Sequence, residues 1–185
     1  MGGLRPRLVV LLVLAGACGE AEPADGGADA GVDAGGVTDA ATAPAPHLEV
    51  GTGGECFLHL ARGDTLGLYR GKQGSQHVLV SVRIRGIEPV GVIVNLVVRR
   101  RRDGQPVSVP YAARLPFDPG PEEGTFDRTG IPLIFEEPAE ALGEPLLLSA
   151  EALDTAGRTA RSGVVIAVAW REDLPKPEPP CPADT

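Results

Sequence analysis

The sequence predicts an all-β domain of about seven or eight antiparallel strands, preceded by a disordered N-terminal tether. Two observations support this fold class. From residue 47 onward, apolar side chains recur at every second position, which places one set on a core face and the other set outward. Turns rich in Gly, Pro and Asp separate these runs, and no segment of ten or more residues has a clear helical period.

The alternating runs define the expected strands. In the run from Val78 to Ile84 the odd positions are polar or outward-facing, and the runs beginning at Val92, Leu146 and Val164 repeat this period. Several outward sets are also apolar, so parts of the second face are expected to be covered. The expected strands cover residues 47–51, 55–60, 65–69, 76–85, 91–102, 106–114, 125–135 (broken), 145–153 and 159–170, and the first two could be one strand with a bulge.

Turn signals connect these strands. Asp103-Gly104 predicts a two-residue hairpin, because glycine adopts a positive φ without steric cost. Asp154 to Gly157 marks a second hairpin, before the last strand, and loops are expected at 71–75, 86–89 and 116–124. Short strands with such turns, in a domain of residues 47–172, are typical of an immunoglobulin-like β-sandwich. A Pro-rich C-terminal tail, residues 173–185, follows it.

The N-terminus has the features of an export signal. Arg5 and Arg7 precede an apolar run, Leu8 to Ala15, of eight residues. A membrane-spanning helix needs about 20 residues, so this run fits the apolar region of a secretory signal better. Small residues lie directly before Cys18.

The end of this signal, Leu14-Ala15-Gly16-Ala17-Cys18, resembles the lipobox of bacterial lipoproteins. The resemblance implies cleavage before Cys18, a diacylglycerol on its thiol and a mature chain that starts there. The family usually has Leu three places before the cysteine, where this chain has Ala15; the alternative is a soluble secreted protein cut after Ala17. Gly19 stands where Asp retains some lipoproteins at the inner membrane, so the resemblance implies the outer membrane, facing the periplasm or the cell surface.

Residues 19–46 form an acidic Ala/Gly/Asp segment. Only Val32 and Val37 are large apolar residues, so the segment cannot offset its ordering entropy and is expected to be a disordered tether. Calcium binding by its spaced aspartates is the alternative, but Asp25, Asp29 and Asp33 do not have the spacing of an EF-hand loop.

Charge argues against a nucleic-acid partner. The whole chain carries a formal charge of −8, and removing residues 1–18 makes it −10, because two arginines and no acids are lost. No basic signature for nucleic acid is present. Arg outnumbers Lys 15 to 2, which is associated with a GC-rich genome.

The three cysteines divide into two roles. With Cys18 assigned to the lipid, Cys56 and Cys181 remain, and paired cysteines of exported proteins persist as disulfides. A bridge between them would tie the C-terminal tail back to the domain. Two free thiols are the alternative.

The whole chain also resembles a set of uncharacterised lipoproteins from GC-rich Gram-negative bacteria. The similarity rests on the signal, the tether and the motifs Gly63-Asp64-Thr65-Leu66 and Gly71-x-Gln73-Gly74-x-Gln76-His77-Val78. The Asp-x-x-Gly-Arg-x-Ala hairpin at 154–160 is similar to the final hairpin of many bacterial immunoglobulin-like domains. The resemblance implies fold and location, and no activity.

No set of residues predicts catalysis, a metal or a cofactor. The histidines are His47, His59 and His77; the last two could be neighbours across a sheet, but no third ligand is evident. Arg62-Gly63-Asp64 is interpreted as a polar turn rather than an integrin-binding motif, and residues 51–54 lack the Lys and helix of a phosphate loop. The densest charge run, Arg99, Arg100, Arg101 and Arg102, could bind an anion or be a solvated hairpin tip.

These features predict a lipid-anchored envelope protein with a non-catalytic immunoglobulin-like module that binds an unknown protein or glycan, or serves a structural role. The alternatives are a small secreted hydrolase or metal-binding enzyme, and an accessory subunit of an envelope complex.

Overall fold

The computed structural model describes residues 44–71, 74–174 and 181. The predicted signal, Cys18 and nearly all of the predicted tether lie outside these residues. Within the described part of the chain, no helix has the length and hydropathy needed to cross a membrane.

The described residues form ten β-strands and two 3-10 turns, which confirms the all-β prediction. The strands outnumber the seven or eight expected. The 55–60 strand is separate from the first strand and shrinks to residues 58–59, and residues 118–119, expected in a loop, form a further short strand. The elements are β1 (His47–Thr52), β2 (Leu58–His59), β3 (Thr65–Arg70), β4 (Gln76–Arg85), β5 (Val92–Arg100), β6 (Tyr111–Leu115), β7 (Asp118–Pro119), β8 (Thr125–Phe135), η1 (Pro138–Glu140), β9 (Leu146–Leu153), β10 (Thr159–Trp170) and η2 (Arg171–Asp173).

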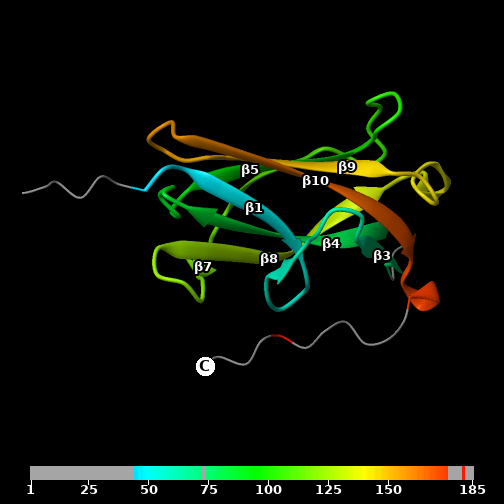
Figure 1. Cartoon of the computed structure of the whole chain (residues 1–185), viewed down its shortest axis with the longest axis horizontal. Helices are drawn as coiled ribbons and strands as arrows, with labels where there is room; N and C mark the ends of the chain where they lie inside the picture. Colours follow the sequence, from blue (N-terminus) through cyan, green and yellow to red (C-terminus); the bar gives the residue numbers. More distant parts are fainter. Residues whose placement is uncertain (1–43, 72–73, 175–180, 182–185) are drawn as a thin grey trace, which may run out of the picture. The chain divides into compact units, whose positions relative to one another are not determined.

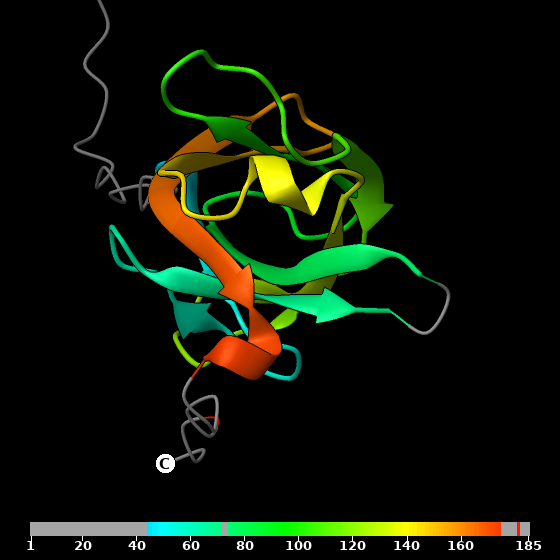
Figure 2. The same cartoon turned by 90° about the vertical axis from the view of Figure 1, so that its right-hand side faces the viewer.

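All ten strands belong to one curled sheet (Figures 1 and 2). One half has the order β10-β9-β5-β6, with antiparallel pairing throughout. The other half centres on β4, which pairs with β8 along most of its length and with β1 on its opposite edge. The two halves face each other across the core, so the sheet has the form of a half-barrel.

Strand β3 joins the two halves. Its first four residues pair in parallel with β10, in the register Thr65↔Ala167, and its last two pair antiparallel with β4, where Tyr69 lies opposite His77. The prediction of antiparallel strands alone is therefore wrong at β3. The periodicity of a strand indicates which side chains are buried but not the direction of its neighbour.

The period-two pattern places the core as predicted. In β4, Val78, Val80, Val82 and Ile84 have no exposed surface, and the even-numbered positions of β5 and β9 face them from the other half. Phe135 at the end of β8 is also fully buried. The alternation thus confirms the assignment of core and outward faces except at Ser81 of β4. The prediction places Ser81 outward, but it is fully buried, because the β4–β8 register shifts between Val80 and Val82, and its hydroxyl donates to the Gly53 carbonyl.

The hairpin expected at Asp103-Gly104 is longer than two residues and is interrupted. The Gly104 N–H donates to the Arg100 carbonyl at 2.9 Å, and the Arg100 N–H donates to the Gln105 carbonyl at 2.9 Å, so four residues form the turn. The strand expected over 106–114 begins only at Tyr111. Residues 106–108 still contact β5, since Pro106 forms a bridge with Arg99 and the Val107 N–H donates to the Val98 carbonyl. The pairing is then interrupted, because Val109 donates to the Ile134 carbonyl of β8 and Pro110 has no N–H to donate.

Candidate functional site

The candidate site lies on the outer face of the β10-β9-β5-β6 half. The odd-numbered residues of β5 and β9 point outward, because their neighbours occupy the core. Half of these outward positions are apolar (Ile93, Val97, Leu147 and Leu153), and one row across three strands is polar throughout. The register aligns Asn95 of β5, Glu151 of β9 and Arg161 of β10 in this row.

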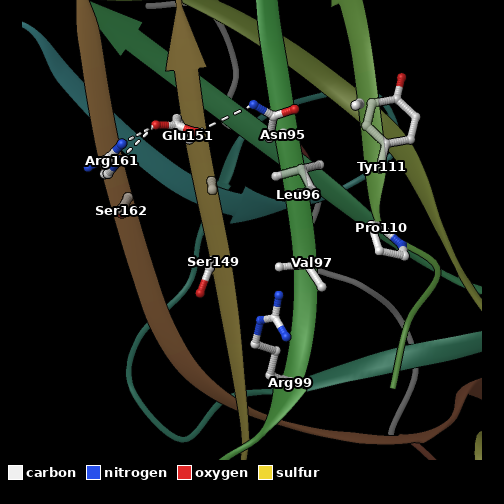
Figure 3. A pocket seen from close by; sticks show the side chains of 12 residues that line it. Asn95, Leu96, Val97, Arg99, Pro110, Tyr111, Ser149, Glu151, Arg161 and Ser162 are labelled. Carbon is white, nitrogen blue, oxygen red and sulfur yellow. Dashed lines mark hydrogen bonds and ion pairs between the residues drawn. The ribbon is translucent and has the colours of Figure 1, made fainter. Parts of the chain in front are cut away.

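The three side chains form a connected hydrogen-bond row (Figure 3). The Arg161 Nε donates to the Glu151 carboxylate at 2.8 Å, and the Asn95 Nδ2 donates to its other oxygen at 3.4 Å. The Arg161 side chain is 77% exposed and that of Glu151 33% exposed. The carboxylate is thus oriented from both sides, while the Arg161 guanidinium remains open to a ligand.

A hollow of about 440 Å³ lies over this row. Next to the polar row, Val97 and Ser149 occupy the following register position, with Arg99 beyond them. Pro110 and Tyr111 line the side at the edge strand β6 (Figure 3). The hollow therefore combines charged donors, a charged acceptor, a hydroxyl and apolar side chains, which is the mixture that binding sites use to orient a ligand.

The predicted bridge between Cys56 and Cys181 is present. Their Cα atoms are 5.7 Å apart, within the range of disulfides, and the two sulfurs are bonded. Residue 181 thereby returns to the loop after β1. The lipid carrier predicted at Cys18 lies outside the described residues and stays a prediction.

The four arginines at 99–102 do not share one face. Arg99 and Arg100 are half-buried at the end of β5, and Arg101 and Arg102 are exposed in the turn. Acidic partners surround two of them: Arg100 is 3.3 Å from Asp103 and 3.3 Å from Glu140, and Arg102 is 3.0 Å from Glu144.

These acids offset much of the positive charge of the turn. The hydrogen bond from the Gln105 N–H, together with the neighbouring Arg100, lowers the pKa of Asp103 below its usual value. Arg100 and Arg102 are therefore engaged in ion pairs, and Arg101 and Arg102 lie in the exposed turn. Anion binding by this run stays a prediction.

The histidines are dispersed. His59 lies opposite Gly51, and His77 lies opposite Tyr69 and Ile134, so the register does not make the two histidines cross-strand neighbours. The His77 ring stacks on the Tyr69 ring, and the two ring centres are 5.9 Å apart. Within the described ranges, no three His, Cys, Asp or Glu side chains are grouped so that they could hold a metal.

The Arg62-Gly63-Asp64 segment is a turn, as predicted. The Asp64 carboxylate accepts a hydrogen bond from the Ala61 N–H at 2.7 Å, and the Gly63 N–H donates to the Val165 carbonyl of β10. These bonds give the aspartate a structural role in the turn.

A second polar hollow, of about 420 Å³, lies beside the disulfide. Arg83 of β4 and Asp127 of β8 form two hydrogen bonds there, at 2.7 and 2.8 Å, and both side chains are less than one-fifth exposed. The bond to Asp127 raises the pKa of Arg83 above its usual value, against the effect of burial. The Arg83 guanidinium also lies over the Phe57 ring, 4.3 Å from its centre. Arg83 is therefore engaged by Asp127 and Phe57 of the same domain.

The sequence did not indicate either polar hollow. The signal that was present is a polar or charged residue in the middle of each outward set, Asn95 between Ile93 and Val97 and Glu151 two residues after Ser149. The sequence cannot show that these positions share one row, because the row depends on the register of three strands.

Comparisons with known proteins do not assign the site. No protein-family model, curated protein or solved structure matches the chain. The interpretation therefore depends on the geometry of the chain itself.

Proposed function

We propose that the chain is a lipid-anchored envelope protein whose immunoglobulin-like domain binds a protein or glycan in the hollow on the outer face of β10-β9-β5-β6. The observation that carries this proposal is the row formed by Asn95, Glu151 and Arg161. Its donors and acceptor are held by the strand register before any ligand arrives, which reduces the cost of ordering them on binding.

The order of the strands supports the immunoglobulin-like assignment. Strand β9 lies between β5 and β10, and β4 pairs with β8. The same order, C-F-G in one layer with B next to E in the other, defines the immunoglobulin sandwich. In this assignment β3 closes one side by pairing with both layers, which gives the sheet its curled form.

The N-terminal sequence supports the anchor. The positive residues, the short apolar run and the small residues before Cys18 have the order of a lipoprotein signal. Replacing Cys18 with Ala should release the protein from the membrane fraction. Retention of the C18A protein in that fraction would count against lipid attachment.

The binding role is tested by a matched pair of variants. Glu151→Ala removes the acceptor at the centre of the row, whereas Glu172→Ala removes the partner of Arg70 in an exposed ion pair outside the hollow. The tagged mature chain, its E151A form and its E172A form would each be incubated with envelope extract and with an array of glycans, and the bound species identified.

We expect a ligand that the parent and E172A proteins hold alike and that E151A holds at least about tenfold more weakly, since a hydrogen bond to a charged group is lost. Equal affinity of E151A for the same ligand would show that the row is not the binding site. Turnover of an envelope substrate by the chain would favour the hydrolase alternative.

A further inference from the structure

The end of the domain at which the chain enters carries an exposed apolar tip. The first described residues, Pro44 and Ala45, lie directly against Gly86, where a Cβ would collide with their carbonyl oxygens. The β4–β5 loop continues from Gly86 to Gly91. Its Glu88 N–H donates to Asp154 in the β9–β10 hairpin, so the hairpin lies at this end as well (Figure 1).

Val90 projects from this loop. It is 73% exposed, more than the other exposed large hydrophobic residues in the part of the chain that the structure describes. With Pro89, Pro116 and Phe117 it lines a hollow of about 520 Å³. We call these four residues the entry tip. Pro116 is exposed as well, whereas Pro89 and Phe117 are half-buried and Phe117 packs against the core.

Two arginines flank the entry tip. Arg85 and Arg114 are both exposed, and neither has an ion pair among the described residues. The Arg114 guanidinium lies against Gly91, next to Val90. Exposed acids also occur here, at Glu88 in the same loop and at Glu122 and Glu123 in the β7–β8 turn, so the end has no strong net charge. Arginine beside apolar side chains is the combination found where proteins meet the headgroup layer of a bilayer.

We propose that the entry tip docks on the surface of the bilayer that carries the lipid anchor, with Val90 inserted among the acyl chains near the headgroups and Arg114 on a lipid phosphate. This proposal rests on the proposed anchoring at Cys18. The place where the chain enters supports the bilayer as the occupant: the segment that leads to Cys18 joins the domain at this end, 25 residues (19–43) after the lipid-bearing position.

The anchor makes a small tip sufficient. Two exposed and two half-buried apolar side chains alone bind a bilayer weakly, because membrane affinity scales with the apolar area that is buried. A domain tethered to the same surface has a local concentration in the range of mM, so a weak second contact becomes populated. Docking would also fix the orientation of the domain and turn the Asn95–Glu151–Arg161 face sideways to the membrane, since strands β5, β9 and β10 run away from the entry tip.

The test uses fluorescence of a tryptophan placed at the tip. The chain from Cys18 to Thr185 would be coupled through its Cys18 thiol, as a thioether, to a maleimide-headgroup lipid in phosphatidylcholine vesicles. Cys56 and Cys181 are bonded to each other, so Cys18 is the remaining thiol of the three cysteines. Chemical coupling makes the result independent of whether cells attach a lipid to Cys18, which the fractionation of the C18A protein tests separately.

Three proteins would be compared: the parent, Val90→Trp and Ile134→Trp. Ile134 is 42% exposed and lies opposite His77, at the far end of β4 from Arg85, so it is the matched control. The parent gives the contribution of Trp170, which also lies at the end of β10 away from the tip. Both substituted positions are exposed, and circular dichroism would verify that the variants fold.

We expect the emission of V90W to shift to shorter wavelength on the vesicles and to be quenched by brominated lipid, with no change for I134W or the parent. Adding Arg114→Glu to V90W should reduce the quenching, and an unchanged signal would remove Arg114 from the contact. Identical behaviour of V90W and I134W would overturn the proposal. It would also be overturned by a V90W shift that appears without vesicles and grows with protein concentration, because a second copy of the chain would then be the occupant.

Discussion

The backbone N–H and the Nε of Arg158 both donate to the carboxylate of Asp154, at 2.8 and 2.7 Å. The same buried carboxylate accepts from the N–H groups of Ala156 and Glu88. One side chain therefore closes the β9–β10 turn and ties it to the β4–β5 loop. Replacing it with Ala should leave these donors unsatisfied and lower the Tm by roughly 5 °C or more. Thermal melts followed by circular dichroism, with the exposed Asp118→Ala as control, would measure the loss; equal Tm values for the two variants would contradict it.

Asp154 also makes stability depend on pH. Burial alone would raise its pKa, but the hydrogen bonds from Arg158 and Glu88 outweigh burial and hold the pKa below the usual value of 3.8. A carboxylate whose pKa is depressed by folding contributes stability above the unfolded pKa and loses it as the pH falls through the folded pKa. Acidification from about pH 5 to pH 3 should therefore lower the Tm of the parent more than that of Asp154→Asn. Parallel pH curves for the two proteins would exclude this role.

The Arg83–Asp127 pair should matter more for folding than the exposed pairs do. Arg83→Met leaves the Asp127 carboxylate largely buried without its partner, which we expect to cost about 2–3 kcal/mol of unfolding free energy. Arg161→Met is the matched control, because its partner Glu151 lies in an exposed pair worth less than about 1 kcal/mol. Urea unfolding of the parent and both variants would compare the two costs. A larger loss for R161M than for R83M would contradict the assignment.

The disulfide should contribute through the unfolded chain. Cys56 and Cys181 are 125 residues apart, and closing a loop of this length stabilises a domain by up to about 5 kcal/mol in the chain-entropy model. Dithiothreitol should lower the Tm of the parent and have no effect on a Cys56→Ser, Cys181→Ser double variant. Mass measurement without reductant should show a bonded pair; two free thiols in the folded protein would refute the bridge.

The sequence predicted the local features of the fold and missed those that depend on distant pairing. Alternation identified the buried face of β4, β5 and β9 because each strand has its own period. It could not identify the parallel contact between Thr65 and Ala167, since the choice of neighbour is a property of the whole sheet. Pro110, directly before β6, was visible in the sequence, and its missing N–H group was the local signal that the 106–114 strand would be interrupted.

The candidate site shows the same division. The Cys56–Cys181 pair was predictable because only two cysteines remain once Cys18 is assigned to the predicted lipid. Asn95, Glu151 and Arg161 come from three strands, and their contact requires two registers to be correct at once. Arg83 and Asp127 likewise meet only through the pairing of β4 with β8. A site can be predicted from sequence when few residues of the required type exist or when its residues are close in the chain.

The dual pairing of β3 determines when the fold can be completed. Its parallel partner in β10 is synthesised about 100 residues later. During synthesis, the first four residues of β3 have no native neighbour on β10 until nearly the whole domain has emerged. Such a topology delays closure of the sheet, because contacts of long sequence separation form slowly. A polypeptide that stops short of Thr159 lacks β10, the partner through which β3 joins the two halves, so quality control would encounter an open sheet edge rather than a smaller folded domain.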